Sequence, residues 1–309
     1  MSRPRSDFRN RAEYGAYRAV RALAGSLGPR SLASLGAGVG RLFLATGSRR
    51  REILRFNLAL AYPEKSERER EALGLEVARH FGRVALDTLR LQRVSPEEFL
   101  SSLEVRGEEH VYAAAERGRG SLLLTAHLGM WEVAGLAAGL LLPNDLLVVN
   151  RPLDNPLLER DVVAFRRRFG TEPLGKRNII RAILQHLKGG HSVGFLVDQR
   201  VDPSVGVEVP FFGHPAWTHP IIARIVRKTM APVVPVFSLW EGPGRYSMTC
   251  LDPIYPDTLS AEELGDVPMT SRFSSITEEA IRRRPEQWLW YHDRWRNIRL
   301  ESQKSELES

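Results

Sequence analysis

The stretch SLLLTAHLGMWEVAG, residues 121–135, places two polar residues, His127 and Glu132, inside an otherwise apolar run. In a regular α-helix, residues five apart point about 140° away from each other, so these side chains cannot meet within one helix. They can meet if a strand ends near His127, Gly129 permits a turn, and Glu132 lies in the first turn of a following helix. The stretch therefore predicts a strand, a turn and a helix.

The rest of the chain after residue 121 shows the same mixture of strand-like and helix-like patterns. Short apolar runs such as HSVGFLVDQ, residues 191–199, alternate with amphipathic stretches such as NPLLERDVVAFRRRFG, residues 155–170. Such alternation predicts an α/β fold, a mixed β-sheet flanked by helices, in which ligands sit beyond the carboxyl ends of parallel strands. Before residue 118 the pattern is helical, and Ser66 is the expected N-cap of a long helix.

Domain organisation follows from the lack of a Gly/Ser-rich or Pro-rich linker. We expect one structural domain with a helical, membrane-associating portion (1–118), an α/β core (119–300) and a flexible tail (301–309). The segment SLASLGAGVGRLFLAT, residues 31–46, is interrupted by Arg41 and falls short of the about 20 apolar residues that span a bilayer. It can pack as a core helix, but the arginines that follow it favour a position in the membrane interface.

The net charge of +7 favours acidic partners, which include nucleic acid, anionic lipid and acidic carrier proteins. No RNA-binding or zinc-finger signature is present, so we do not expect nucleic acid to be the partner. The single cysteine excludes an intramolecular disulfide and a site with several thiolate ligands. The N-terminus lacks the apolar core of a secretory signal, which predicts that the protein is not exported.

The chemistry of His127 depends on what holds its ring. If Glu132 orients the imidazole, the exposed nitrogen can act as a general base; alternatively, His127 is a strand-end histidine held by a capping glutamate. No Gly-x-Ser-x-Gly motif follows a strand, so a serine hydrolase is not favoured. A base without a protein nucleophile suits the activation of a substrate hydroxyl or of water. The spacing is not that of a zinc peptidase and nothing fixes further ligands, so we expect no metal at the other candidate residues, Asp198, His186, His191 and His214.

Several segments carry a family resemblance. TAHLGMWEVAG resembles the His-x4-Asp/Glu motif of glycerolipid-type acyltransferases, in the form typical of the bacterial lipid A lauroyl/myristoyl acyltransferase family. Further matching segments occur in the same order and at similar spacing as in that family: RREILRFNLALAYPEKSERER (50–70), VVNRPLDNPLLERDVVAFRRRFG (148–170), VGFLVDQRVDPSVGVEVPFFGHPAWTHP (193–220), APVVPVF (231–237) and RRRPEQWLWYHDRWR (282–296).

This resemblance implies the transfer of a fatty acyl chain from acyl carrier protein, or from a CoA thioester, to a hydroxyl of a membrane glycolipid such as a lipid A precursor. The enzyme would sit on the cytoplasmic face of the inner membrane as a peripheral or monotopic protein. His127 would take the proton of the attacking hydroxyl while Glu132 holds the imidazole, with no acyl-enzyme, cofactor or metal. The resemblance also extends to acyltransferases of mannosylated phosphatidylinositol, and a non-catalytic lipid-binding relative and a hydrolase are the alternatives from other classes.

The same segments supply candidate substrate-binding residues. Arg151 has the bidentate guanidinium that suits a phosphate of the acceptor or donor, against the alternative of a structural salt bridge. Asp198 and Gln199 end a predicted strand and would build the site or bind the acceptor, whereas the alternative for Asp198 is a loop cap. Phe211 and Phe212 would form a wall for the acyl chain, or else pack in the core.

One departure from the family pattern falls inside the motif. Many family members carry Asn where this chain has Met130. We expect this change to alter the polarity of the site or its preference for an acceptor without removing the base.

Overall fold

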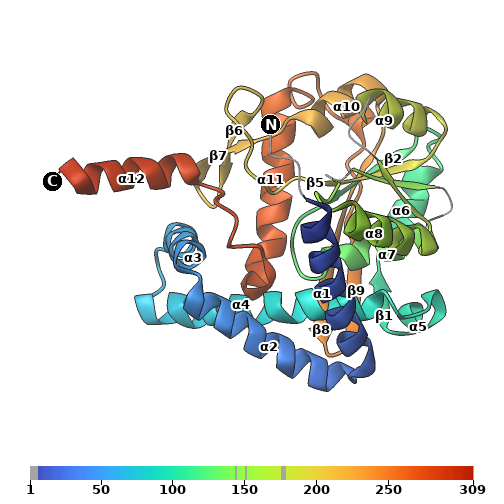
Figure 1. Cartoon of the computed structure of the whole chain (residues 1–309). Helices are drawn as coiled ribbons and strands as arrows, with labels where there is room; N and C mark the ends of the chain where they lie inside the picture. The colour runs from blue at the N-terminus through green and yellow to red at the C-terminus, as the bar shows by residue number, and fades with distance from the viewer. Residues whose placement is uncertain (1–5, 143–144, 150–151, 175–178, 309) are drawn as a thin grey trace.

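The computed structural model describes residues 6–142, 145–149, 152–174 and 179–308 (Figure 1). No helix within these ranges combines the length and the apolar composition that crossing a membrane requires. An N-terminal layer of helices precedes the sheet, as the sequence predicts. Its members are α1 (Asp7–Ser26), α2 (Pro29–Thr46), α3 (Ser48–Ala61), α4 (Glu67–Leu91) and α5 (Pro96–Ser101).

Helix α2 lies along α4 because glycines remove the side chains between them. A Cβ atom at Gly40 would lie 1.8 Å from the carbonyl oxygen of Ala78, and one at Gly82 would lie 1.9 Å from the carbonyl oxygen of Gly36. Such close backbone contact tolerates no side chain at these positions. One face of α2 therefore packs against α4, and the opposite side of the helix is exposed.

Seven of the described strands form one sheet in the order β1-β9-β8-β2-β5-β3-β4. Neighbouring strands from β8 to β4 are parallel, β9 runs antiparallel to β8, and β1 is parallel to β9. This mixed α/β fold confirms the predicted fold class. The strands are β1 (Leu103–Arg106), β2 (Ser121–Thr125), β3 (Leu146–Val149), β4 (Thr171–Leu174), β5 (Ser192–Leu196), β8 (Val233–Gly242) and β9 (Arg245–Cys250).

Helices cover both faces of the sheet (Figure 1). In β2, Leu123 joins an apolar cluster with Val133, whereas Leu122 and Leu124 join another with Ile183. Burial on both faces explains why this strand is continuously apolar rather than alternating. The helices are α6 (Glu108–Ala115), α7 (Trp131–Leu141), α8 (Pro156–Arg168), α9 (Ile179–Lys188), α10 (Ile221–Thr229), α11 (Asp266–Arg283) and α12 (Arg296–Glu308), and the strands β6 (Val207–Phe211) and β7 (His214–Thr218) form a separate hairpin.

Two details differ from the sequence prediction. The portion before residue 118 is not wholly helical, because β1 forms the edge of the sheet beside β9. The segment 301–308, where we predict a flexible tail, continues α12 as a helix. The division at residues 118 and 300, and the mobility of the tail, stay predictions.

Candidate active site

The ends of two neighbouring strands bring His127 and Asp198 together. His127 comes two residues after β2 and Asp198 two residues after β5, and the strands are paired in parallel with Thr125 opposite Leu196. Because parallel strands end at the same edge of a sheet, the two side chains meet there. The site therefore lies at the carboxyl edge of the sheet, where the alternation of strands and helices predicts it.

The Asp198 carboxylate holds the imidazole of His127. One of its oxygens lies 2.9 Å from His127 Nδ1, and the other accepts the His127 backbone N–H at 2.9 Å and the Trp288 indole N–H at 2.8 Å. A carboxylate can only accept, so Nδ1 carries the proton and Nε2 keeps its lone pair. The Asp198 residue is 3% exposed, so the surrounding structure fixes this pair.

The electrostatics of the pair favour a basic ring. Burial lowers the pKa of His127, but the charge of Asp198 and its hydrogen bond outweigh burial and raise that pKa above its usual value. Burial raises the pKa of Asp198, but the His127 charge and the hydrogen-bond donors around the carboxylate more than reverse this and lower it. His127 therefore has the hydrogen bonding and basicity of a general base.

The turn between His127 and α7 needs a glycine. Gly129 has φ of +60°, and a Cβ atom there would lie 2.1 Å from the carbonyl oxygen of Ser238. The predicted strand, turn and helix are confirmed by β2, this turn and α7. Met130, the next residue, is 1% exposed and packs in the apolar core, outside the residues that line the cavity beside His127. The Met130 side chain therefore does not form part of the cavity wall, and its effect on the site or on the choice of acceptor stays a prediction.

Glu132 has another partner. Arg166 on α8 donates from its terminal nitrogen to one carboxylate oxygen at 2.6 Å, and from Nε to the other at 3.2 Å. The prediction that Glu132 holds the imidazole is wrong, because Asp198 already accepts from Nδ1 and Arg166 engages both Glu132 oxygens. The charge of Glu132 still makes a smaller contribution that raises the pKa of His127.

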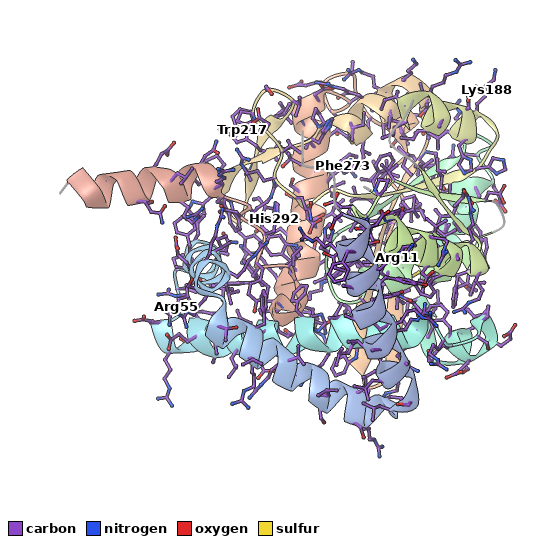
Figure 2. The ribbon with its side chains drawn as sticks, in the orientation of Figure 1. Arg11, Arg55, Lys188, Trp217, Phe273 and His292 are labelled. Carbon is purple, nitrogen blue, oxygen red and sulfur yellow. The ribbon has the colours of Figure 1, made fainter. Side chains whose placement is uncertain are left out.

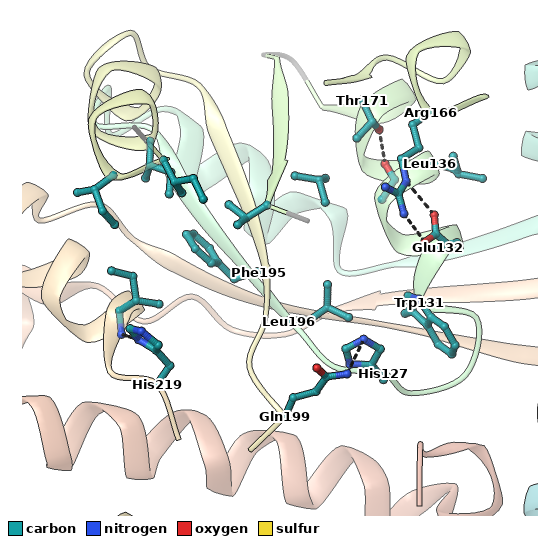
Figure 3. A pocket seen from close by; sticks show the side chains of 17 residues that line it. His127, Trp131, Glu132, Leu136, Arg166, Thr171, Phe195, Leu196, Gln199 and His219 are labelled. Atoms are coloured by element: carbon teal, nitrogen blue, oxygen red, sulfur yellow. Dashed lines mark hydrogen bonds and ion pairs between the residues drawn. The ribbon is translucent and has the colours of Figure 1, made fainter. Parts of the chain in front are cut away.

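A cavity of about 470 Å³ opens beside His127 (Figure 3). The Glu132–Arg166 pair lies in its wall, and the Gln199 amide lies 3.4 Å from His127 Nε2. Most of the remaining lining is apolar, so the cavity can enclose hydrocarbon next to a base. The apolar lining includes Leu136, Val148, Ile179, Ile180, Ile183, Phe195 and Ile221.

Phe211 and Phe212 do not line this cavity. They are 1% and 4% exposed, and the ring of Phe211 lies 5.6 Å from that of Trp295, as the ring of Phe212 does from that of Trp290. The predicted acyl wall at these residues is wrong. The turn between β6 and β7 instead directs both rings onto the tryptophans of the C-terminal segment, which is the core-packing alternative.

The other sequence candidates have mixed outcomes. Arg151 lies outside the described residues, and Gln199 lines the cavity as expected of a site residue. No group of three or more His, Cys, Asp and Glu side chains in the described part of the chain could hold a metal ion. Sequence reasoning missed Arg166 and Trp288. Neither carries a local signal, because each reaches the site from a segment distant in the sequence.

Comparisons with known proteins point in one direction. The model of a family described as bacterial lipid A biosynthesis acyltransferase matches residues 6–297. The chain is 28% identical to the lipid A biosynthesis lauroyltransferase of Escherichia coli (strain K12), over 85% of this chain and 84% of that protein. It is also 28% identical to the lipid A biosynthesis myristoyltransferase of the same organism, over 92% and 87%. A solved structure, the 1-acyl-sn-glycerophosphate acyltransferase PlsC of Thermotoga maritima, matches with a TM-score of 0.40 and 15% identity over 87% of this chain and 99% of that one, a likeness too weak to assign function.

Proposed function

The chain belongs to the bacterial lipid A biosynthesis acyltransferase family, and on this premise we propose that it transfers a fatty acyl chain from a thioester to a hydroxyl of a lipid A precursor. The proteins that it resembles are named as lipid A acyltransferases, and this chain is an acyltransferase. The observation that supports the mechanism is the His127 ring, with Nδ1 bonded to buried Asp198 and Nε2 beside an apolar cavity.

In this mechanism His127 Nε2 removes the proton of the acceptor hydroxyl as its oxygen attacks the thioester carbonyl carbon. The tetrahedral intermediate collapses, the carbon–sulfur bond breaks, and the imidazolium returns its proton to the leaving sulfur. Asp198 is a positioning residue, which keeps the ring in the required tautomer and stabilises its charged form. The acyl group passes directly between substrates without an acyl-enzyme.

Different parts of the cavity suit different parts of the substrates. We assign the acyl chain to its apolar wall, which includes Leu136, Ile183 and Phe195. The thioester carbonyl would lie near His127, where the Gln199 amide can contact the reacting groups. The donor in this proposal is an acyl carrier protein or a CoA thioester.

We further propose that the enzyme attaches peripherally to the cytoplasmic face of the inner membrane. The face of α2 that turns away from α4 carries Leu35, Val39 and Leu42, which are 43%, 46% and 63% exposed. Their spacing of four and three residues aligns them on one face of the helix. An aligned apolar stripe on a net positive protein suits the interface of an anionic membrane.

The test is acyl transfer by the purified protein to vesicles that contain a lipid A precursor, with labelled acyl carrier protein or acyl-CoA as donor. His127→Ala should lower the rate about 10²–10⁴-fold, the usual contribution of a general base. His110→Ala, on α6 and away from the cavity, is the matched control. Equal labelling of lipid by wild type and His127→Ala would reject the mechanism, and release of free fatty acid without labelled lipid would identify a hydrolase instead.

A further inference from the structure

A second hollow lies where α3 and α12 begin. It has a volume of about 350 Å³ and is lined by four arginines, by His292 and Asp293, and by the apolar side chain of Ile53. Figure 1 shows α3 and the start of α12 on the same side of the molecule, and Figure 2 marks His292 in that region. The arginines of this basic pocket come from three segments: Arg49 and Arg50 from α3, Arg200 from the loop after β5, and Arg296 from α12.

The positive charge of the basic pocket is not neutralised from within. Asp293 is the one acid among the described residues that line it, and its two oxygens accept from Arg299 at 3.0 and 2.6 Å. In the part of the chain that the structure describes, Arg49 and Arg296 are exposed and form no ion pair. These two guanidinium groups are therefore accessible to an anion from outside the protein.

The other two arginines are held by neutral groups. Arg50 donates to the backbone carbonyl of Tyr291 at 2.9 Å, and Arg200 donates to the Asn297 side-chain oxygen at 3.0 Å. Arg200 Nε is buried and has no acceptor among the described residues. Fixed guanidinium groups that keep unused donors are preorganised for an anion with several oxygens.

The helix ends reinforce the positive potential. The first turn of α3 has no acidic residue and no side-chain cap, yet it carries consecutive arginines. Arg296 is the first residue of α12. Cations at the positive end of a helix dipole are unfavourable, whereas an anion there is stabilised by the dipole and by the free N–H groups. An anion in the pocket would therefore offset the unfavourable placement of these arginines.

The basic pocket and the candidate active site are lined by neighbouring residues of one loop. Arg200 directly follows Gln199, whose amide lies 3.4 Å from His127 Nε2. The backbone N–H of Arg200 donates to His292 Nε2 at 2.8 Å, and burial lowers the pKa of His292 to about 4, so its ring is neutral at physiological pH. The charge of the pocket therefore resides on its arginines.

We propose that the basic pocket binds a phosphate group of one of the two substrates while the acyl chain lies in the apolar cavity. The proposal rests on the proposed function, because it assigns the anion to a substrate of that reaction. Arginine forks match the geometry of phosphate oxygens, and two or more of them can bind one phosphate at once. The phosphate can belong to the glycolipid acceptor or to the phosphopantetheine of the donor, and the two sources are separable by experiment.

The first measurement is independent of turnover. We would titrate the full-length protein with inorganic phosphate and follow binding by phosphorus NMR. The double variant Arg49→Gln, Arg296→Gln should bind phosphate at least about tenfold more weakly, because it loses two charge-assisted contacts. The control for lost positive charge on α3 is Arg55→Gln, which removes one charge at a residue paired with Glu71 outside the basic pocket. Thermal unfolding confirms that each variant is folded, and equal phosphate binding by wild type and the double variant would overturn the proposal.

The second measurement identifies the source of the phosphate. The double variant should raise KM about tenfold for the substrate that carries the bound phosphate, with kcat little changed. If the acceptor supplies it, the increase disappears with a dephosphorylated acceptor; if the donor supplies it, the increase disappears with an acyl-pantetheine that lacks phosphate. An equal KM increase with and without phosphate on both substrates would reject the assignment. Intact phosphate binding in a wild-type protein that transfers no acyl group would reject the acyltransferase mechanism while leaving the basic pocket as a phosphate site.

Discussion

In most folded proteins, charged side chains are exposed and apolar side chains are buried. The strand-end site departs from this by burying a charged side chain, and the outer face of α2 departs from it by exposing apolar ones. At the strand ends, a carboxylate, Asp198, is 3% exposed, whereas on α2 the apolar side chain of Leu42 is 63% exposed. Folded proteins seldom bury an acid without partners or leave aligned apolar side chains in water. Asp198 and the α2 stripe are the two places to which we assign a function in the proposals above.

The two departures differ in what supports them. Asp198 is supported from within, because it accepts hydrogen bonds from the backbone and ring of His127 and from the indole of Trp288. The stripe on α2 stays exposed in the described chain, and an aligned apolar surface of this kind is typical of an interaction site. The first arrangement is complete in the isolated molecule, and for the second we propose a membrane as the partner.

Removing the buried charge of Asp198 should have the largest effect on activity. We expect Asp198→Asn to lower kcat/KM about 10²–10⁴-fold, because the ring loses the acceptor that fixes its tautomer. His127 acts as a base when neutral, so activity is present above its pKa and lost below it. Asp198 raises that pKa and burial lowers it, so the acid limb of the pH profile should move to lower pH in the variant. Asp202→Asn, an exposed acid on the same loop, is the control, and an unshifted acid limb in Asp198→Asn would contradict the assigned role.

Charging the exposed stripe should have the next largest effect. We expect Val39→Glu, Leu42→Glu to weaken binding to phosphatidylglycerol vesicles about thirtyfold, since each side chain loses about 1 kcal/mol of burial in the interface. Vesicle flotation measures the binding, and Ser34→Glu places a new charge on α2 beside the stripe as control. The melting temperature should change little because these side chains are exposed. Unchanged flotation of the double variant would show that another surface meets the membrane.

Breaking the ion pair between Glu132 and Arg166 should have the smallest effect. In Glu132→Gln, the half-buried Arg166 loses its ion-pair partner, and we expect unfolding to cost about 2 kcal/mol less, or a melting temperature about 3 °C lower. The acid limb should shift less than in Asp198→Asn, because Glu132 contributes less to the pKa of His127. Glu172→Gln on the neighbouring exposed pair with Arg167 should leave stability nearly unchanged. A larger shift of the acid limb in Glu132→Gln than in Asp198→Asn would reverse our ranking of the two acids.

Local geometry could be predicted from the sequence where one short segment determines it. The spacing of His127 and Glu132 and the glycine between them specify a strand, a turn and a helix start, because each is decided within a few residues. The alternation of apolar and amphipathic runs likewise predicts the α/β fold. The short strand β1 could not be predicted, because its four residues lie within a region whose pattern is otherwise helical.

The partners in the site could not be predicted, because they depend on strand order and on distant segments. Nothing local indicates that β5 lies beside β2, so the sequence predicts that Asp198 builds the site or binds the acceptor but does not pair it with His127. Arg166 comes from a helix 34 residues beyond Glu132, and a match of residue type does not reveal such a pairing. For Phe211 and Phe212, aromatic residues at a turn can face either a cavity or the core, and the tryptophans that enclose them come from the end of the chain.

The contact between Trp288 and Asp198 also determines when the hydrogen bonds of the Asp198 carboxylate are complete. During synthesis, His127 and Asp198 leave the ribosome well before Trp288, whose indole donates the last hydrogen bond to the carboxylate. Until then the nascent chain has an acid and a base but lacks the wall that keeps water from the acid. The order of translation thus delays completion of the site until nearly the whole chain has emerged.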